Sequence, residues 1–233
     1  MKYQHIKEGI FKERPNRFVA KAEIQGEIHT VHVKNTGRCR ELLVPGAKVF
    51  LEYDPEAEKK GRKTQYSLVA VRKEKLLINM DSQAPNEAAA EWLHGGGFER
   101  ETGLKPRQIQ REVTYGQSRF DLAFTVEEKQ AFMEVKGVTL EINGTAMFPD
   151  APTERGVKHL QELAQAAGQG FAAYVLFVIQ MKGVTRFEPN EKMHKEFAQA
   201  LRDAGKAGVK ILAYDCLVRE DGFVIDQKVP VSL

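Results

Sequence analysis

Three residues in the middle of the chain have side chains suited to metal-dependent hydrolysis. Glu134 follows Asp121 by thirteen residues, and Lys136 stands two residues beyond Glu134. Because strand side chains repeat every two residues, Glu134 and Lys136 share one face of a strand predicted over residues 131–136. Two carboxylates hold a hard cation such as Mg²⁺, which keeps several waters. A lysine beside them orients the attacking water or neutralises charge on the transition state.

A hairpin would bring Asp121 to the same edge of a sheet. The apolar residues of the strand predicted at 118–126 share one parity, opposite to that of Asp121: Phe120, Leu122, Phe124 and Val126. Residues 127–130 form a polar turn, which predicts that the strands on either side of it pair. The alternative is a solvated strand face, on which Asp, Glu and Lys are common. The dense charges and helix-start signals at 148–160 favour a site.

Neighbouring elements would place further polar groups beside these carboxylates. The strand predicted before the hairpin carries Glu112, which either supports the metal ligands from outside or lies on the surface. Proline and threonine residues after the hairpin predict a helix that carries Arg155, Lys158 and His159. These side chains would face the metal edge and are candidates for phosphate contact. No second His or Cys accompanies His159, so for this residue we expect a phosphate contact or a hydrogen-bond role rather than metal ligation.

The rest of the second half is predicted to alternate strands and helices. A polar stretch at 81–86 marks a domain boundary, and Asn86 is predicted to cap a short helix over 87–93. A continuously apolar strand after the next helix favours a parallel crossover. This apolar strand covers 171–179. The elements predicted after it are a helix, a strand and an edge strand or tail: 190–204, 209–218 and 223–231.

The composition is that of an ordinary globular protein. Hydrophobic residues make up 42% and charged residues 29% of the 233 positions, and no apolar run reaches the ~20 residues that span a bilayer. The first eighteen residues are charged throughout and carry no export signal. Cys39 and Cys216 lack metal-like spacing, so we expect free thiols in a cytoplasmic protein with no membrane partner.

Charge is unevenly distributed along the chain. Residues 1–80 hold 17 Lys and Arg against 10 Asp and Glu, a net charge of +7, whereas residues 81–233 hold 18 against 22, a net charge of −4. A basic first third favours an anionic partner such as nucleic acid, and an acidic remainder favours cation binding. Solubility alone would also account for the basic third.

Residues 17–80 are predicted to be all-β. Alternating segments separated by turns indicate five short strands: 18–24, 28–33, 48–53, 66–71 and 76–80. This pattern favours a Greek-key oligonucleotide-binding (OB) barrel, with a small SH3-like barrel as the alternative. Three aromatic residues are predicted to pack in the core rather than to stack on bases: Phe50, Tyr53 and Tyr66.

Two loops of this region are predicted to contact phosphate. The first contains Asn35, Thr36, Arg38 and Arg40, and the second contains Lys59, Lys60, Arg62 and Lys63. For the first loop the alternative is an Asx-type turn that serves the fold, and for the second it is a solvated hairpin tip.

The full chain resembles the sugar fermentation stimulation protein A family of bacteria and archaea. The resemblance rests on six short motifs: Asn35-Thr-Gly37 with Pro45-Gly46, Ser118-Arg-Phe-Asp121, Glu134-Val-Lys136, Phe148-Pro-Asp150, Thr153-Glu-Arg-Gly156 and Lys158-His-Leu160. It implies an α/β (α+β) chain in which a five-stranded OB-like barrel, residues 1–80, precedes residues 81–233. The second domain would be similar to PD-(D/E)XK nucleases, with a mixed central sheet flanked by helices.

The resemblance also implies a site and two candidate functions. The nuclease pattern would fall on Asp121, Glu134 and Lys136, with the backbone carbonyl of Val135 as a further ligand for Mg²⁺ or Mn²⁺. Ser118-Arg-Phe stands where the superfamily pattern has a proline before the aspartate. One function is a metal-dependent nuclease acting on nucleic acid, above all DNA. The other is a nonspecific DNA-binding regulator of sugar (maltose) metabolism that does not turn over.

Overall fold

The N-terminal part of the chain is a closed β-barrel. The computed structural model describes residues 1–35 and 37–233. Its first six strands are β1 (Ile6–Asn16), β2 (Val19–Ile24), β3 (Glu27–Val33), β4 (Lys48–Tyr53), β5 (Tyr66–Lys73) and β6 (Leu76–Asn79). They pair in the order β3-β2-β1-β4-β5-β6, and a parallel pairing of β3 with β5 closes the barrel. The predicted OB barrel is confirmed, but the closed ring consists of β1–β5, with β6 added to β5.

Strand β1 is not predicted by the alternation of apolar and polar residues that indicates the other barrel strands. Of its eleven residues only Gly9 and Phe11 are buried, and most of the others are exposed. Its register against β2 shifts twice, so the two-residue period is interrupted. Pairing with β2 on one side and with β4 on the other holds this polar strand in the barrel.

The rest of the chain contains a mixed six-stranded sheet. Its strands are β7 (Arg107–Tyr115), β8 (Ser118–Val126), β9 (Lys129–Val138), β12 (Ala172–Ile179), β14 (Lys210–Arg219) and β15 (Gly222–Lys228). They lie in the order β15-β14-β12-β9-β8-β7, in which β9, β12 and β14 are parallel. The predicted β8–β9 hairpin, the parallel crossover and the C-terminal edge strand are confirmed.

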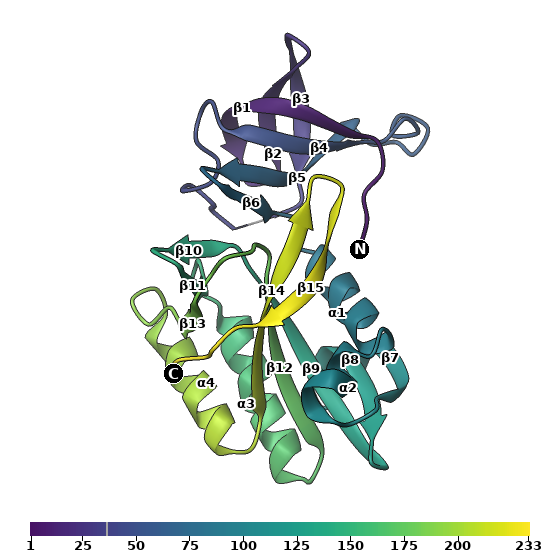
Figure 1. Ribbon diagram of the computed structural model, residues 1–233, viewed down its shortest axis with the longest axis vertical. Coiled ribbons are helices and arrows are strands. Elements are labelled where there is room, and N and C mark those ends of the chain that lie inside the picture. The colour runs from purple at the N-terminus through teal and green to yellow at the C-terminus, as the bar shows by residue number, and fades with distance from the viewer. Residues whose placement is uncertain (36) are drawn as a thin grey trace.

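Helices cover both faces of this sheet (Figure 1). One face packs against α1 (Ala84–His94) and α2 (Gly97–Thr102), and the other against α3 (Glu154–Gly168) and α4 (Lys195–Lys206). A small sheet that the sequence analysis does not predict lies on the barrel side: β10 (Leu140–Ile142), β11 (Thr145–Phe148) and β13 (Arg186–Pro189). In the described part of the chain no helix is long and apolar enough to cross a membrane.

One helix starts where the sequence predicts it, and two start elsewhere. The amide of Gly156 donates to the Thr153 hydroxyl at 3.0 Å, which confirms the predicted start of α3. The prediction that Asn86 caps α1 is wrong: the cap position is Gln83, and Pro85 lies in the first turn, where its missing amide costs nothing. Helix α4 begins at Lys195, later than predicted.

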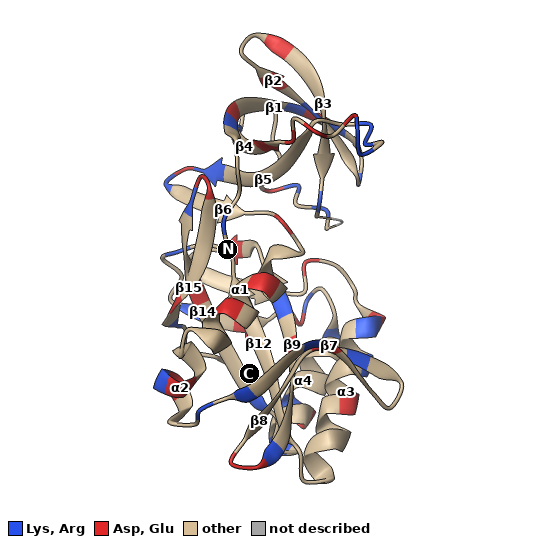
Figure 2. Cartoon of the chain, turned by 90° about the vertical axis from the view of Figure 1, so that its right-hand side faces the viewer, with Lys and Arg blue, Asp and Glu red and all other residues tan. Residues whose placement is uncertain are grey.

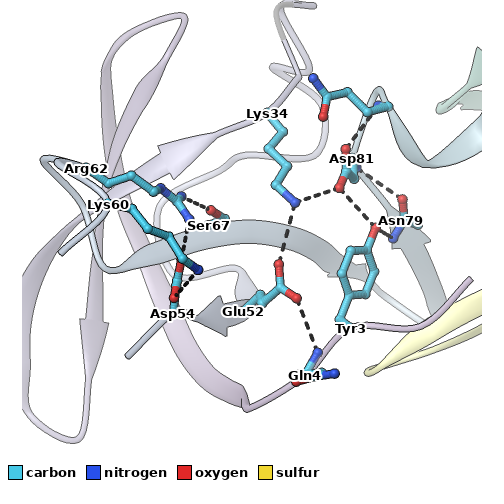
Figure 3. Close-up of polar contacts among 11 residues, drawn as sticks. Tyr3, Gln4, Lys34, Glu52, Asp54, Lys60, Arg62, Ser67, Asn79 and Asp81 are labelled. Carbon is cyan, nitrogen blue, oxygen red and sulfur yellow. Dashed lines mark hydrogen bonds and ion pairs between the residues drawn. The ribbon is translucent and has the colours of Figure 1, made fainter. Parts of the chain in front are cut away.

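A largely buried polar cluster joins the barrel to the larger sheet. We call it the junction cluster and define it as Tyr3, Lys34, Asn79, Asp81 and Gln180. The Lys34 ammonium lies 2.9 Å from an Asp81 carboxylate oxygen, and Asn79 donates to the Tyr3 hydroxyl at 2.9 Å (Figure 3). Gln180, which follows β12, donates to the Asn79 side chain at 2.8 Å and to the Asp81 carbonyl at 3.1 Å. Polar contacts therefore hold the two parts of the chain together.

Candidate metal and nucleic-acid site

The site forms where the β8–β9 ladder stops. These strands pair from their turn as far as Leu122 opposite Met133, and the pairing ends before Asp121. There the backbone amide of Val135 donates to a carboxylate oxygen of Asp121 at 2.8 Å. The aspartate side chain thus takes the place of a strand partner, and this bond fixes its orientation.

The expectation that the apolar residues of β8 share one face is wrong for Phe120. Phe120 packs with Phe132 on the side covered by α3, whereas Leu122 and Phe124 pack on the side covered by α1. The ladder with β9 ends at Leu122, whereas β8 stays paired with β7 on both sides of Asp121, so the change of face between Phe120 and Leu122 is a local twist of β8. The sequence parity alone cannot show this twist.

Asp121 is a half-buried carboxylate with a donor on each oxygen. The second oxygen accepts a hydrogen bond from the side chain of Asn86 at 2.7 Å, in addition to the bond from Val135. Burial, followed by the nearby charge of Glu134, raises the pKa of Asp121 above its usual value. A cation placed between the two carboxylates would relieve this repulsion.

Glu134 presents one paired and one unpaired oxygen. Its side chain is buried, and Oε1 contacts both Lys136 Nζ, at 2.5 Å, and His159 Nδ1. Oε2 is buried and has no hydrogen-bond partner among the described residues. Burial would raise the pKa of Glu134, but the hydrogen bond from His159 and the charge of Lys136 together hold it below its usual value.

These residues line a cavity of about 350 Å³. Its walls bring together both carboxylates, three cations and the first turn of α3: Ser82, Asn86, Glu112, Arg119, Phe120, Asp121, Glu134, Val135, Lys136, Thr153, Arg155 and Gly156. Glu112 lines the cavity, but its carboxylate is exposed and lies 3.6 Å from the Arg119 guanidinium. Glu112 therefore forms an exposed ion pair with Arg119, which agrees with the surface alternative rather than with support of the metal ligands.

The three predicted phosphate contacts on α3 separate in the structure. Arg155 lines the cavity, and its Nε donates to His159 Nε2 at 3.3 Å. His159 is buried behind the cavity wall against Glu134. Lys158 is exposed on another side of the helix, 3.7 Å from Glu162, and is absent from the described cavity lining.

The donor set fits a hard divalent cation of low protein coordination. Among residues 1–35 and 37–233, no three His, Cys, Asp or Glu side chains are grouped so that they could hold a metal. Two carboxylates are nevertheless sufficient for Mg²⁺, which is bound through one or two of them and keeps its waters. The unpaired Oε2 of Glu134 is the observation that fits such an ion, because a buried oxygen without a partner is costly.

Side-chain contacts to its backbone hold the first barrel loop in shape. Asn35 accepts the amide of Gly37 at 2.8 Å, which is the Asx-type turn considered as the alternative. The guanidinium of Arg14 donates to the carbonyls of Asn35, Gly37 and Arg38, so it holds the loop in shape. Arg38 and Arg40 are exposed. Thr36 lies outside the described residues.

The second barrel loop has most of its positive charge paired. Lys60 and Arg62 lie 3.0 and 3.1 Å from the carboxylate of Asp54 (Figure 3), and Lys59 lies 3.0 Å from Glu56. Lys63 is exposed. Among the aromatic candidates, Phe50 is fully buried in the core, whereas Tyr53 and Tyr66 are half-buried and pack on each other with ring centroids 5.1 Å apart.

Basic positions nevertheless occur in both parts of the molecule. Figure 2 shows Lys and Arg on the barrel loops and, in the larger domain, around strand β7 and helix α3. Two residues that contribute to the cavity were not predicted as part of the site: Asn86 and Arg119. Arg119 was available inside the Ser-Arg-Phe-Asp motif, but the contact of Asn86 with Asp121 spans 35 positions and leaves no local signal.

Comparison with known proteins gives a consistent result over the whole chain. Residues 13–80 match the family model described as "SfsA N-terminal OB domain", and residues 83–222 match "Sugar fermentation stimulation protein RE domain". Proteins called sugar fermentation stimulation protein homolog from Desulfitobacterium hafniense (strain Y51) and Ruminiclostridium cellulolyticum are 54% and 49% identical, each over 100% of this chain and over 99% and 100% of their own length. The solved structure of Pyrococcus furiosus SfsA in complex with Ca²⁺ is 27% identical, with a TM-score of 0.88 over 100% of this chain and 98% of that one.

Proposed function

The chain belongs to the sugar fermentation stimulation protein family, and we propose that it is a divalent-metal-dependent nuclease that hydrolyses phosphodiester bonds in DNA. The observation that carries this proposal is the buried, unpaired Oε2 of Glu134 beside the carboxylate of Asp121 in one cavity. The relative from Pyrococcus furiosus was solved in complex with Ca²⁺, a hard cation of the same preference for oxygen.

Four residues of the cavity have a proposed part in the chemistry. Asp121, Glu134 and the carbonyl of Val135 would hold Mg²⁺ or Mn²⁺. The ion supplies Lewis acidity at a phosphoryl oxygen and lowers the pKa of a bound water. Lys136, whose ammonium already lies at Glu134, orients the attacking water or neutralises charge that develops on the phosphate.

Cations around the cavity and on the barrel would hold the nucleic-acid backbone. Arg119 and Arg155 line the cavity itself, where a phosphate beside the scissile one would lie. On the barrel, Arg38, Arg40 and Lys63 are exposed and remain the proposed backbone contacts. Contacts of this kind are electrostatic and carry no sequence information, which agrees with nonspecific binding.

The proposal is tested by assaying cleavage of single- and double-stranded DNA and RNA with Mg²⁺ and with Mn²⁺. Glu134→Gln and Lys136→Met are each expected to reduce cleavage by about 100-fold or more, because the first weakens the metal site and the second removes a charge that acts on the transition state. Glu127→Gln, in the exposed turn of the same hairpin, is the control and should leave the rate unchanged. Absence of cleavage by the unsubstituted protein across these substrates and metals would reject the nuclease.

A second candidate is a DNA-binding regulator that does not turn over. It is favoured by one observation: both oxygens of Asp121 and one oxygen of Glu134 already have protein donors, so the site is largely satisfied by the chain itself. Asp121→Asn would then leave DNA affinity and its salt dependence unchanged in fluorescence anisotropy. Salt-sensitive binding without cleavage by the unsubstituted protein would select this candidate.

A further inference from the structure

His159 contacts the proposed metal ligand from behind the cavity. The residue is 5% exposed, and its ring touches Oε1 of Glu134 through Nδ1. The other ring nitrogen, Nε2, lies 3.3 Å from Nε of Arg155, four residues earlier on α3. Residues four apart on a helix share one face, so both side chains approach the site from the same direction.

The partners of His159 determine where its proton lies. A guanidinium has only N–H donors, so Nε2 of His159 must accept the hydrogen bond from Arg155 and cannot carry a proton itself. A neutral imidazole then has its proton on Nδ1, and Nδ1 donates to Oε1 of Glu134. Three side chains thus form a series of hydrogen bonds with a single direction: Arg155 donates to His159, and His159 donates to Glu134.

This series of hydrogen bonds determines which oxygen of Glu134 is free to bind a metal. Oε1 receives one hydrogen bond from His159 and one from Lys136, whereas Oε2 receives none among the described residues. The two donors fix the rotation of the carboxylate, so that the free lone pairs of Oε2 keep one direction. A ligand held in this way needs no reorganisation when it binds a cation.

We propose that His159 is the positioning residue of the metal site, which acts through Glu134 and selects Oε2 as the single ligand oxygen of that carboxylate. This inference rests on the proposed function, because it requires that Asp121 and Glu134 bind a metal. It assigns Arg155 a second part in addition to phosphate contact: Arg155 sets the tautomer of His159.

Two amide substitutions separate positioning from packing. The amide nitrogen of asparagine stands where Nδ1 of histidine stands, and that of glutamine where Nε2 stands. His159→Asn therefore keeps the donor to Glu134, and we expect its Mn²⁺ affinity in isothermal titration calorimetry to stay within about threefold of the unsubstituted protein. His159→Gln lacks that donor and is expected to bind Mn²⁺ about 10- to 100-fold more weakly, as for other groups that orient a ligand. A purely structural histidine would give equal losses in both variants.

The tautomer itself is measured on the unsubstituted, metal-free protein by long-range ¹H–¹⁵N NMR of its histidines. We expect His159 as the Nδ1–H form, and an Nε2–H form would overturn the inference even if neither variant folds. Equal Mn²⁺ affinity in the unsubstituted protein and His159→Gln would also overturn it while leaving the proposed metal site intact. No Mn²⁺ binding by the unsubstituted protein would instead overturn the proposed function, and this inference with it.

Discussion

The ammonium of Lys34, just after β3, lies 2.9 Å from the carboxylate of Asp81, just after β6, and the Asp81 side chain is only 3% exposed. Lys34 also lies 3.5 Å from Glu52, so one cation serves two carboxylates (Figure 3). Lys34 is partly exposed, but Asp81 is buried, so loss of the lysine leaves the buried charge of Asp81 without compensation.

Lys34→Met is therefore expected to lower the free energy of unfolding by about 3 kcal/mol. Urea denaturation followed by circular dichroism measures the effect. The control is Lys48→Met, which removes the same group from an exposed ion pair with Glu8 and should cost less than about 1 kcal/mol. Equal losses in the two variants would mean that the buried pair has no special weight.

Asn86→Ala is expected to weaken Mn²⁺ binding by about tenfold, because Asp121 loses the donor that orients one of its oxygens. The helix itself should keep its stability, since Asn86 lies inside α1 and does not cap it. Titration calorimetry measures the affinity and thermal melting the stability. Glu87→Ala, on the next residue of the same helix, removes only an exposed pair with Arg111 and should leave Mn²⁺ affinity unchanged.

The pair of Lys73 in β5 and Glu141 in β10 predicts a pH-dependent stability. The hydrogen bond from Lys73 lowers the pKa of Glu141 in the folded protein. A lowered folded-state pKa gives stability that is present above the unfolded pKa of a glutamate, about 4.3, and lost as the pH falls through the lowered value. Glu141→Gln should therefore be less stable than the unsubstituted protein at pH 7, by no more than about 1 kcal/mol for this partly exposed pair, and the difference should shrink below about pH 4. A difference that grows with acidity would contradict this assignment.

Gly37→Ala tests how closely the first barrel loop approaches the second half of the chain. A Cβ atom at Gly37 would lie 2.3 Å from an Asp150 carboxylate oxygen, so the loop or Asp150 must move. We expect a loss of about 1–3 kcal/mol in urea denaturation, as for other overpacked positions. Gly168→Ala, where nothing lies within 4 Å of the new atom, is the control and should change stability by less than about 1 kcal/mol.

The sequence predicts those parts of the site whose residues lie close together in the chain, where the two-residue repeat of a strand applies. Glu134 and Lys136 are two residues apart on one strand, and the structure brings Lys136 Nζ to Oε1 of Glu134. The hairpin then brings Asp121 near them through a turn that composition identifies. Each of these steps depends on geometry within about fifteen residues, where the strand period holds.

The missing parts depend on contacts between distant segments. Asn86 was predicted as a helix cap, and nothing near it in the chain indicates Asp121 as its partner. Lys60 and Arg62 were predicted as phosphate contacts from their charge, and their ion pairs with Asp54 are not visible in that local pattern. Strand β1 was not predicted because pairing on both sides, rather than burial of alternate side chains, keeps it in place.

The junction cluster also bears on how such a chain could be recombined. A chimera that took residues 1–80 from an unrelated barrel protein would receive Asp81 and Gln180 from this chain and would have to supply its own equivalents of Tyr3, Lys34 and Asn79. Without them, Asp81 and Gln180 would stay buried but lose their side-chain contacts with the barrel. The two regions matched by separate family models are therefore not freely exchangeable modules, and inheritance of one constrains inheritance of the other.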